Sequence, residues 1–357
     1  MDLLSCHAFD VGNKPASESR IGQLRQHRGH PRCVSVKFIM NRAPEALVAA
    51  LLTNRLVTSE TKALTAREFW NLFSSSEKLH GLIDMDSSQI AQHLSVDLEF
   101  SDRIVALLAT SRAFAFEVER LEETDLRIVT AFDDDFPEKL RRSLGSQCPV
   151  VLLTTGLSEW LSLPSIGIVG SRAIGLESME VARNIAQLAV QLGYGVVSGL
   201  AKGIDQTSMH SATEIEGRVI GFPTEGLHVI SQRSDVRMAI HDGRLTLASP
   251  FNPKAPFSVG GAMARNKLIY GLADATIVVT SDKDKGGTWG GATEAIDKSY
   301  GHVIVWNGPG MGGGNLPLIH RGATGLEGLS PDLLTSALQK SADVKSRAYT
   351  FEALRLF

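Results

Sequence analysis

The chain has 357 residues, with 36 Lys and Arg against 39 Asp and Glu, 43% hydrophobic residues and a formal net charge of −3. This length supplies about two domains, and the apolar fraction excludes a disordered or fibrous protein. No apolar run approaches the ~18–20 residues that span a bilayer, and the N-terminus lacks the basic and then apolar pattern of a secretory signal. Cys6, Cys33 and Cys148 are too few and too far apart for a disulfide framework or a zinc site. We therefore expect a cytoplasmic protein with no membrane contact, cofactor or bound metal.

The near-neutral total hides an uneven distribution of charge. Residues 1–40 carry six basic and three acidic side chains, whereas residues 41–150 carry twelve basic and eighteen acidic ones. No segment forms a strongly basic block. Nucleic acid would therefore have to be bound by a local patch of cations.

Residues 1–39 are rich in Arg, His, Gln and Ser and have no sustained apolar period, which predicts a disordered basic tail. The tail is either a flexible arm or sequence upstream of a start at Met40. Residues 40–125 predict a helical domain, because apolar residues recur at three- and four-residue intervals through AREFWNLF, SSQIAQHL and SDRIVALLATSRAFAFEVERL. Pro44 and Glu45 suit the first turn of its first helix. The candidate N-cap residues further along are Ser87, Ser88, Ser101 and Asp102.

Residues 126–325 predict a second, Rossmann-like domain. Residues 126–156 indicate a connector made of a strand, an acidic turn, a short helix and an extended segment. Residues 164–306 then alternate apolar strands with amphipathic helices. The predicted strands are 166–170, 195–199, 218–222, 245–249, 275–281 and 302–306, and the predicted helices are about 176–192, 204–216, 261–272 and 292–300. Strands that are apolar at nearly every position are typical of a parallel sheet with helices on both faces.

The fold class that follows is α/β: an extended Rossmann-like parallel sheet with helices on both faces, preceded by a small α-helical domain. Residues 326–357 are expected to form a C-terminal tail with a short helix.

Unusual residues gather in four loops that should lie at one edge of this sheet. Ligands of open parallel sheets bind beyond the carboxyl ends of the strands, where such loops lead into helices. Glycine lets a backbone approach a ligand, helix N-terminal amides donate hydrogen bonds to anions, and Arg and Lys pair with phosphate. The candidate binding residues are Gly170, Ser171, Arg172, Gly199, Lys202, Gly203, Asp205, Arg265, Asn266, Lys267, Gly287 and Thr288.

Some of these roles stay open at this stage. Asp205 suits either an N-cap or a carboxylate that orders its loop. Arg265 and Lys267 lie about 200° apart on a helix, so that one could face a ligand while the other faces solvent. Gly287 and Thr288 belong to an expected glycine-rich turn, GGTWGG. Taken together, the four loops favour a ligand with several phosphates, and no catalytic constellation stands out beside them.

The motifs GIVGSR, VVSGLAKGID, FxxxxxMARNKLIYGLADATIVV and KGGTWGGATEAI, in this order, resemble the DprA/Smf family of bacterial DNA-processing proteins. The resemblance implies binding of single-stranded DNA without strong sequence preference, a homodimer, and loading of a RecA-type recombinase during natural transformation. It also implies a basic pocket formed by Arg172, Lys202, Arg265 and Lys267. No enzymatic activity is expected.

Two alternatives come from other functional classes. The first is an antitoxin-like or accessory component of a phage-defence module, with the acidic helical domain docking a toxin-like protein partner. The second is a nucleotide-binding, phosphoribohydrolase-like enzyme in which Glu294, within GGTWGGATE, is the candidate catalytic acid.

Overall fold

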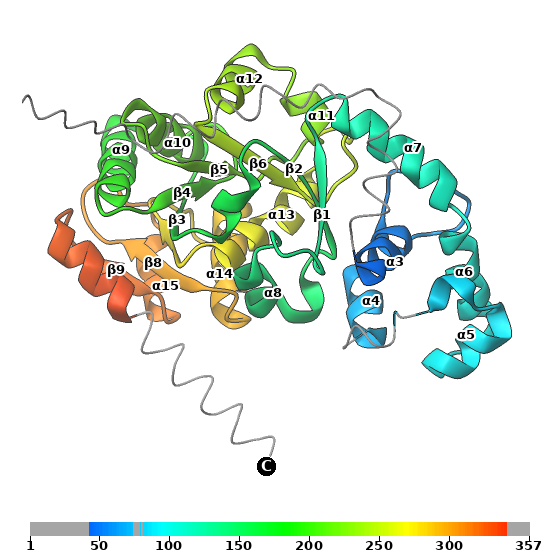
Figure 1. Cartoon of the computed structure of the whole chain (residues 1–357). Coiled ribbons are helices and arrows are strands. Elements are labelled where there is room, and N and C mark those ends of the chain that lie inside the picture. Colours follow the sequence, from blue (N-terminus) through cyan, green and yellow to red (C-terminus); the bar gives the residue numbers. More distant parts are fainter. Residues whose placement is uncertain (1–42, 74–78, 80, 341–357) are drawn as a thin grey trace, which may run out of the picture.

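The computed structural model describes residues 43–73, 79 and 81–340. A nine-stranded sheet is covered by helices on both faces, and the helices of residues 44–122 pack beside its β1–β2 edge (Figure 1). This arrangement confirms the predicted α/β fold class and the N-terminal helical region. The predicted basic tail of residues 1–39 and residues 341–357 lie outside the described residues. Within the described residues, no helix is long and apolar enough to cross a membrane.

The strands lie in the order β1-β2-β6-β5-β4-β3-β7-β8-β9. All pairings from β6 across to β9 are parallel, whereas β1 pairs with β2 and β2 with β6 in antiparallel orientation. The strands are β1 (Arg127–Thr130), β2 (Val151–Thr155), β3 (Ser165–Val169), β4 (Gly195–Ser198), β5 (Val219–Gly221), β6 (Leu245–Ser249), β7 (Ala275–Val278), β8 (His302–Trp306) and β9 (Thr324–Leu326). The extended segment that was expected at the end of the connector is therefore strand β2, which pairs with β6 and belongs to the sheet.

Helices bury both faces of the sheet, because successive strand residues point to opposite sides. Ile168 belongs to the core that contains α9 (Leu176–Gln191) and α10 (Ile204–Glu214). The next residue, Val169, belongs to the core that contains α13 (Val259–Leu272) and α14 (Gly286–Asp297). The remaining helices of this part are α8 (Glu138–Leu144), η4 (Gly145–Gln147), η5 (Ser158–Ser162), α11 (Leu227–Ile230), α12 (Ser234–His241), α15 (Asn315–His320) and residues 331–340.

Helix α14 begins at Gly286, and the expected glycine-rich turn is its first two turns. The prediction of a helix that starts near residue 292 was wrong, because tertiary packing overrides the poor helix propensity of glycine. A Cβ added at Gly290 would lie 2.7 Å from Met263 Cε, and one at Gly291 would lie 3.1 Å from Asn266 Nδ2. Glycine thus lets α14 pack closely against α13.

The N-terminal helices are α3 (Pro44–Thr53), α4 (Ala66–Leu72), η3 (Leu82–Asp84), α5 (Ser87–Leu94), α6 (Leu98–Leu108) and α7 (Ser111–Glu122). The predicted caps were wrong by one to five residues. Asp86 caps α5 in a reciprocal capping box with Gln89, and Asp97 caps α6 by accepting from the Phe100 amide. Ser101 and Asp102 lie inside α6. In both helices the N-cap is an aspartate that precedes the predicted serines, and its carboxylate accepts a hydrogen bond from a backbone amide in the first turn.

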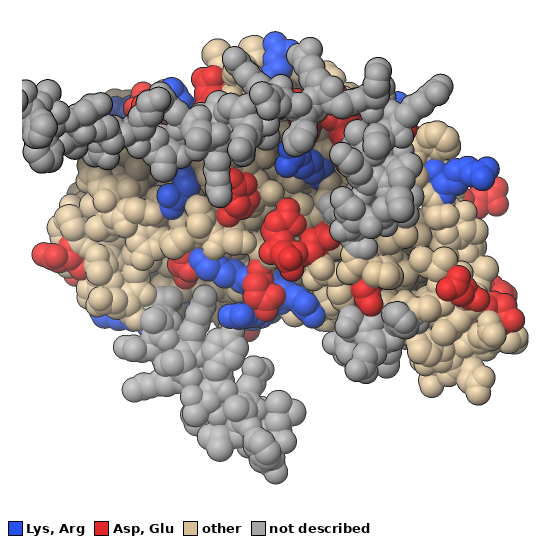
Figure 2. All heavy atoms as spheres, viewed as in Figure 1, with Lys and Arg blue, Asp and Glu red and all other residues tan. Residues whose placement is uncertain are grey.

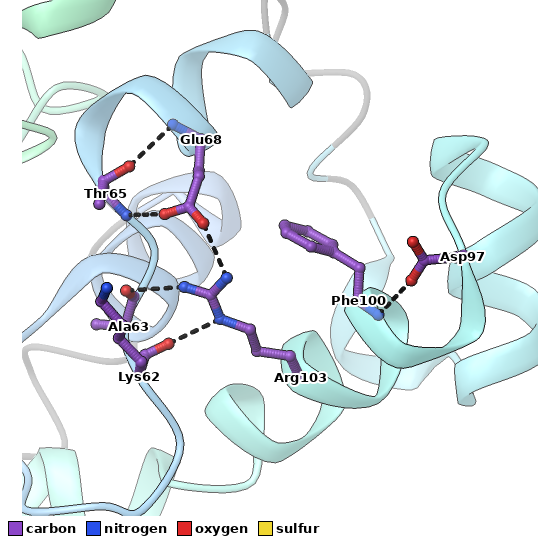
Figure 3. A network of polar contacts seen from close by, with 7 residues as sticks. All are labelled: Lys62, Ala63, Thr65, Glu68, Asp97, Phe100 and Arg103. Atoms are coloured by element: carbon purple, nitrogen blue, oxygen red, sulfur yellow. Dashed lines mark hydrogen bonds and ion pairs between the residues drawn. The ribbon is translucent and has the colours of Figure 1, made fainter.

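One arginine joins these helices (Figure 3). Arg103 on α6 donates to Glu68 Oε1 on α4 at 2.9 Å, and to the backbone oxygens of Lys62 and Ala63 at 2.9 and 3.0 Å. Glu68 also closes a capping box with Thr65. The hydrogen bond from Arg103 lowers the pKa of Glu68 to about 2, so this carboxylate stays ionised at neutral pH.

Candidate functional site

A cavity of about 400 Å³ lies where the strand order reverses. Strands β4, β5 and β6 lie in turn on one side of β3, and β7, β8 and β9 lie in turn on its other side. Such a reversal opens a crevice at the carboxyl ends of the strands. The lining residues that matter below are Gly170, Ser171, Arg172, Asp205, Phe257, Val259, Met263, Arg265, Asn266, Tyr270, Asp282, Lys285, Gly286, Gly287 and Thr288.

The loop after β3 is tied to the end of β7. The Ser171 amide donates to Thr280 O at 3.0 Å, and the Ser171 hydroxyl donates to the same oxygen at 3.4 Å. These bonds hold the backbone of residues 170–172 across the crevice. Arg172 follows directly and lines the cavity.

The loop between β4 and α10 is ordered by Asp205. Its Oδ2 accepts from the Gly199 amide at 3.2 Å, and the residue is buried in the first turn of α10. Gly203 is the N-cap residue instead, at φ +86°, and a Cβ there would lie 2.5 Å from Ser171 O. Leu200 adopts a left-handed φ of +57°, which costs about 1–2 kcal/mol for a non-glycine residue. The loop is therefore a strained, tightly packed support for the cavity.

A buried ion pair forms the floor of the cavity. Arg265, 3% exposed, places Nη1 4.0 Å from Asp205 Oδ2, which is itself buried. Gly199 makes room for this guanidinium, since an added Cβ would lie 1.5 Å from Nη1. Burial raises the pKa of Asp205 to about 6 despite the opposing charge of Arg265, and burial lowers the pKa of Arg265.

Two polar groups of this floor have no hydrogen-bond partner. They are Arg265 Nε and the hydroxyl of Tyr270, both buried among the described residues. A buried donor without a partner costs about 1–3 kcal/mol. Both side chains line the cavity, and the two unpartnered atoms lie buried beneath its surface.

The start of α14 forms the opposite wall. Gly286, Gly287 and Thr288 line the cavity, and no side chain caps this helix. Asn266 Nδ2 donates to Gly287 O at 3.0 Å, which fixes the helix start against α13. Free amides at a helix N-terminus favour anions, so this wall adds backbone donors to the cationic side chains.

The structure brings eight of the twelve predicted residues to the cavity: Gly170, Ser171, Arg172, Asp205, Arg265, Asn266, Gly287 and Thr288. Gly199 and Gly203 pack behind it. Lys202 is exposed and does not line it, and Lys267 reaches a separate cavity on the other flank of α13, 3.5 Å from Gln147 Oε1. The four-cation pocket implied by the resemblance thus contains only Arg172 and Arg265 of its expected members.

Lys285 and Phe257 also line the cavity, although neither was among the predicted binding residues. Both are the first residues of motifs in the sequence, KGGTWGGATEAI and FxxxxxMARNKLIYGLADATIVV. With Lys285, three basic side chains face two acidic ones, Asp205 and Asp282. Figure 2 shows basic and acidic side chains interspersed on the visible face, with no broad basic surface among the coloured residues.

Other candidate chemistry lies elsewhere. Glu294 Oε1 accepts from Lys298 Nζ at 2.7 Å and from Tyr300 Oη at 3.1 Å, and does not line the cavity. This geometry gives the phosphoribohydrolase-like alternative no support. Within the part of the chain that the structure describes, no cluster of three His, Cys, Asp or Glu side chains could hold a metal ion.

Comparison with known proteins places the chain in a family. The family "DNA recombination-mediator protein A" matches residues 127–335. The chain is 31% identical over 182 residues to DNA processing protein DprA of Bacillus subtilis, covering 49% of this chain and 60% of the relative. It is 29% identical over 230 residues to Protein Smf of Synechocystis, covering 62% and 56%. The chain thus spans little more than half the length of these curated relatives.

The fold agrees with this assignment. The X-ray structure of DprA from Streptococcus pneumoniae matches with a TM-score of 0.59 at 20% identity, over 76% of this chain and 98% of that one. The strands and loops of the cavity lie within the family match, which covers more than half of the chain. The protein therefore belongs to the DprA/Smf family of DNA processing proteins.

Proposed function

We propose that this protein binds single-stranded DNA through the cavity between β3 and β7, and that it acts in DNA processing during recombination and transformation. The observation that carries the proposal is Arg265, a buried guanidinium that lines the cavity and whose Nε has no hydrogen-bond partner. Arg172, Lys285 and the amides of α14 surround the same space. This donor set fits the phosphates of a DNA backbone and reads no base edge, so binding is independent of sequence.

Family membership supports DNA as the polyanion, since the curated relatives are named for DNA processing. It favours this role over the antitoxin-like alternative. The proposal includes a homodimer and a RecA-type recombinase partner, which the resemblance implies. Among the described residues, no set of catalytic side chains supports the enzymatic alternative.

The proposal is tested by fluorescence anisotropy with a labelled oligothymidylate and a duplex of equal length at low salt. Arg172→Glu and Lys285→Glu should each weaken binding of the single strand at least about tenfold, or 1.4 kcal/mol. Lys202→Glu is the matched control, because this lysine lies outside the cavity lining, and should change the affinity less than about twofold. Wild-type affinity in Arg172→Glu, or an equal loss in Lys202→Glu, would reject the cavity as the DNA site.

A further inference from the structure

A second cavity, of about 190 Å³, lies at the junction between the N-terminal helices and the sheet. The helical region lines it with residues 53–56, Leu64 and Ala66, and the rest of its lining comes from residues 147–153, 249–252 and α13. Helix α13 separates this junction cavity from the cavity between β3 and β7, because Arg265 lines that one whereas Lys267 lines this one. A ligand in the junction cavity would therefore contact both regions of the chain.

The charged side chains that line the junction cavity are all basic. They are Lys267 on α13 and Arg55 just after α3, and none of the described residues in the lining is Asp or Glu. Neither side chain forms an ion pair within 4.0 Å with another described residue. A cleft lined by charge of one sign concentrates ions of the opposite sign. The lining therefore favours an anion as the ligand.

The amine of Lys267 has few partners for a half-buried cation. It donates one long hydrogen bond, to Gln147 Oε1 at 3.5 Å, although an ammonium group has three donors. Burial lowers the pKa of Lys267, and the charge of Glu294 acts against this shift. That carboxylate is itself held by Lys298 and Tyr300. An oxyanion in the cavity would give the amine the charged partner that it lacks.

The backbone that carries Arg55 is fixed at the edge of the junction cavity. Oδ1 of the buried Asn54 accepts from the amides of Leu56 and Val57 at 3.1 and 3.3 Å, which sets the turn after α3. The backbone oxygen of Arg55 accepts from Asn252 Nδ2 at 2.7 Å, and Asn252 follows β6 and lines the same cavity. The turn is thus tied to the sheet region, and its guanidinium starts from a fixed point beside the cavity.

The other walls of the junction cavity are largely apolar, with Leu56, Leu64, Leu153, Phe251 and Leu268 among them. Pockets for drug-sized ligands measure about 300–1,000 Å³, so this smaller cavity suits a smaller molecule. We propose that the junction cavity binds a small organic acid, whose carboxylate or phosphate group pairs with Lys267 and Arg55 while its apolar body packs against these walls. This inference goes beyond the proposed function, because neither basic side chain lines the cavity between β3 and β7.

The test uses benzoate and phenyl phosphate as probes, and benzyl alcohol as a ligand with the same ring and no charge. The thermal midpoint of the full chain is measured against the concentration of each, since a ligand that binds only the folded state raises it. At least one of the two anions should give a saturable rise, and benzyl alcohol should give none. The anion that acts identifies the preferred headgroup. Lys267→Met and Arg55→Gln should each weaken its apparent affinity at least about tenfold.

Two controls locate the bound anion. Arg237→Gln removes an exposed arginine of α12 that does not line the junction cavity, and should keep the wild-type affinity within about twofold. Arg172→Gln should also keep it, because Arg172 lines the other cavity. Arg55 is exposed, so Arg55→Gln still gives a result if Lys267→Met does not fold.

Three results would overturn the inference. The first is no rise with either anion, and the second is an equal rise with benzyl alcohol. The third is wild-type affinity in Arg55→Gln or Lys267→Met, or a loss in Arg172→Gln alone, which would place the anion in the cavity between β3 and β7. None of these results bears on the binding of DNA, which the oligonucleotide titrations test separately.

Discussion

Replacing Arg265 with Met would leave Asp205 as a buried carboxylate without its ion-pair partner. Both side chains are buried, and they lie 4.0 Å apart. Removing one partner of such a pair costs about 3–5 kcal/mol, because the other charge stays in a medium of low polarity. Arg265→Met should therefore lower the free energy of unfolding by about 3–5 kcal/mol at pH 8.

The loss should depend on pH with a definite sign. The pKa of Asp205 is raised from its usual 3.8 to about 6, so the folded state holds this proton more tightly than the unfolded state does. Stability from this group is present at low pH and is lost as the pH rises through 6. At pH 5 Asp205 is mostly protonated with or without Arg265, and the charge-dependent part of the loss should nearly disappear.

The assay is urea unfolding followed by circular dichroism at pH 8 and pH 5. The double variant Asp205→Asn/Arg265→Met is the control, since it removes the stranded charge and should be more stable than Arg265→Met at pH 8. An equal loss at both pH values would refute the reasoning. So would a double variant that is no more stable than the single one, because the pair would then be unimportant to the fold.

Three further predictions follow from single features. Protonation of Asp205 removes a negative charge beside Arg265. In anisotropy titrations, the affinity of the wild type for oligothymidylate should therefore rise by about tenfold as the pH falls from 7.5 to 5.5. The affinity of Asp205→Asn should change much less over the same pH range. Gly203→Ala should lower the thermal midpoint more than Gly243→Ala does; both glycines have positive φ, but only at Gly203 would the new Cβ meet backbone, so equal shifts would contradict the packing. Arg103→Met should lower the free energy of unfolding of the helical region by about 1–3 kcal/mol in urea unfolding. In the wild type, the lowered pKa of Glu68 stabilises the fold at neutral pH, and this stability is lost as the pH falls from about 4.5 toward 2. The variant should lack this acid-dependent loss, and an acid sensitivity equal to that of the wild type would contradict the prediction.

The fold was predictable because the strands are apolar throughout and alternate with amphipathic helices, a pattern that few architectures share. The region of the cavity followed from the rule that ligands bind at the carboxyl ends of such strands. Predictions from the local preferences of residues failed where tertiary packing determines the secondary structure. Glycines at 286–291 suggest a turn, yet α14 needs them to approach α13.

The membership of the site was harder to predict, because a motif gives spacing but not the direction of a side chain. Lys202 and Lys267 stand in the right motifs, yet one is exposed outside the cavity and the other lies on the far flank of α13. Phe257 is the first residue of the motif FxxxxxMARNKLIYGLADATIVV, but the spacing of the motif did not show that its side chain lines the cavity. The ion-pair partner of the buried Asp205 is likewise Arg265, which is distant in sequence.

The salt dependence of binding tests the central claim most directly. For single strands, the logarithm of the association constant falls against the logarithm of salt concentration with a slope of about −0.7 for each phosphate charge that is neutralised. Arg172, Arg265 and Lys285 at the cavity predict a slope of about −2 for the wild type and about −1.4 for Arg172→Gln. A slope that Arg172→Gln leaves unchanged, with wild-type affinity, would contradict the assignment of this cavity to the DNA backbone.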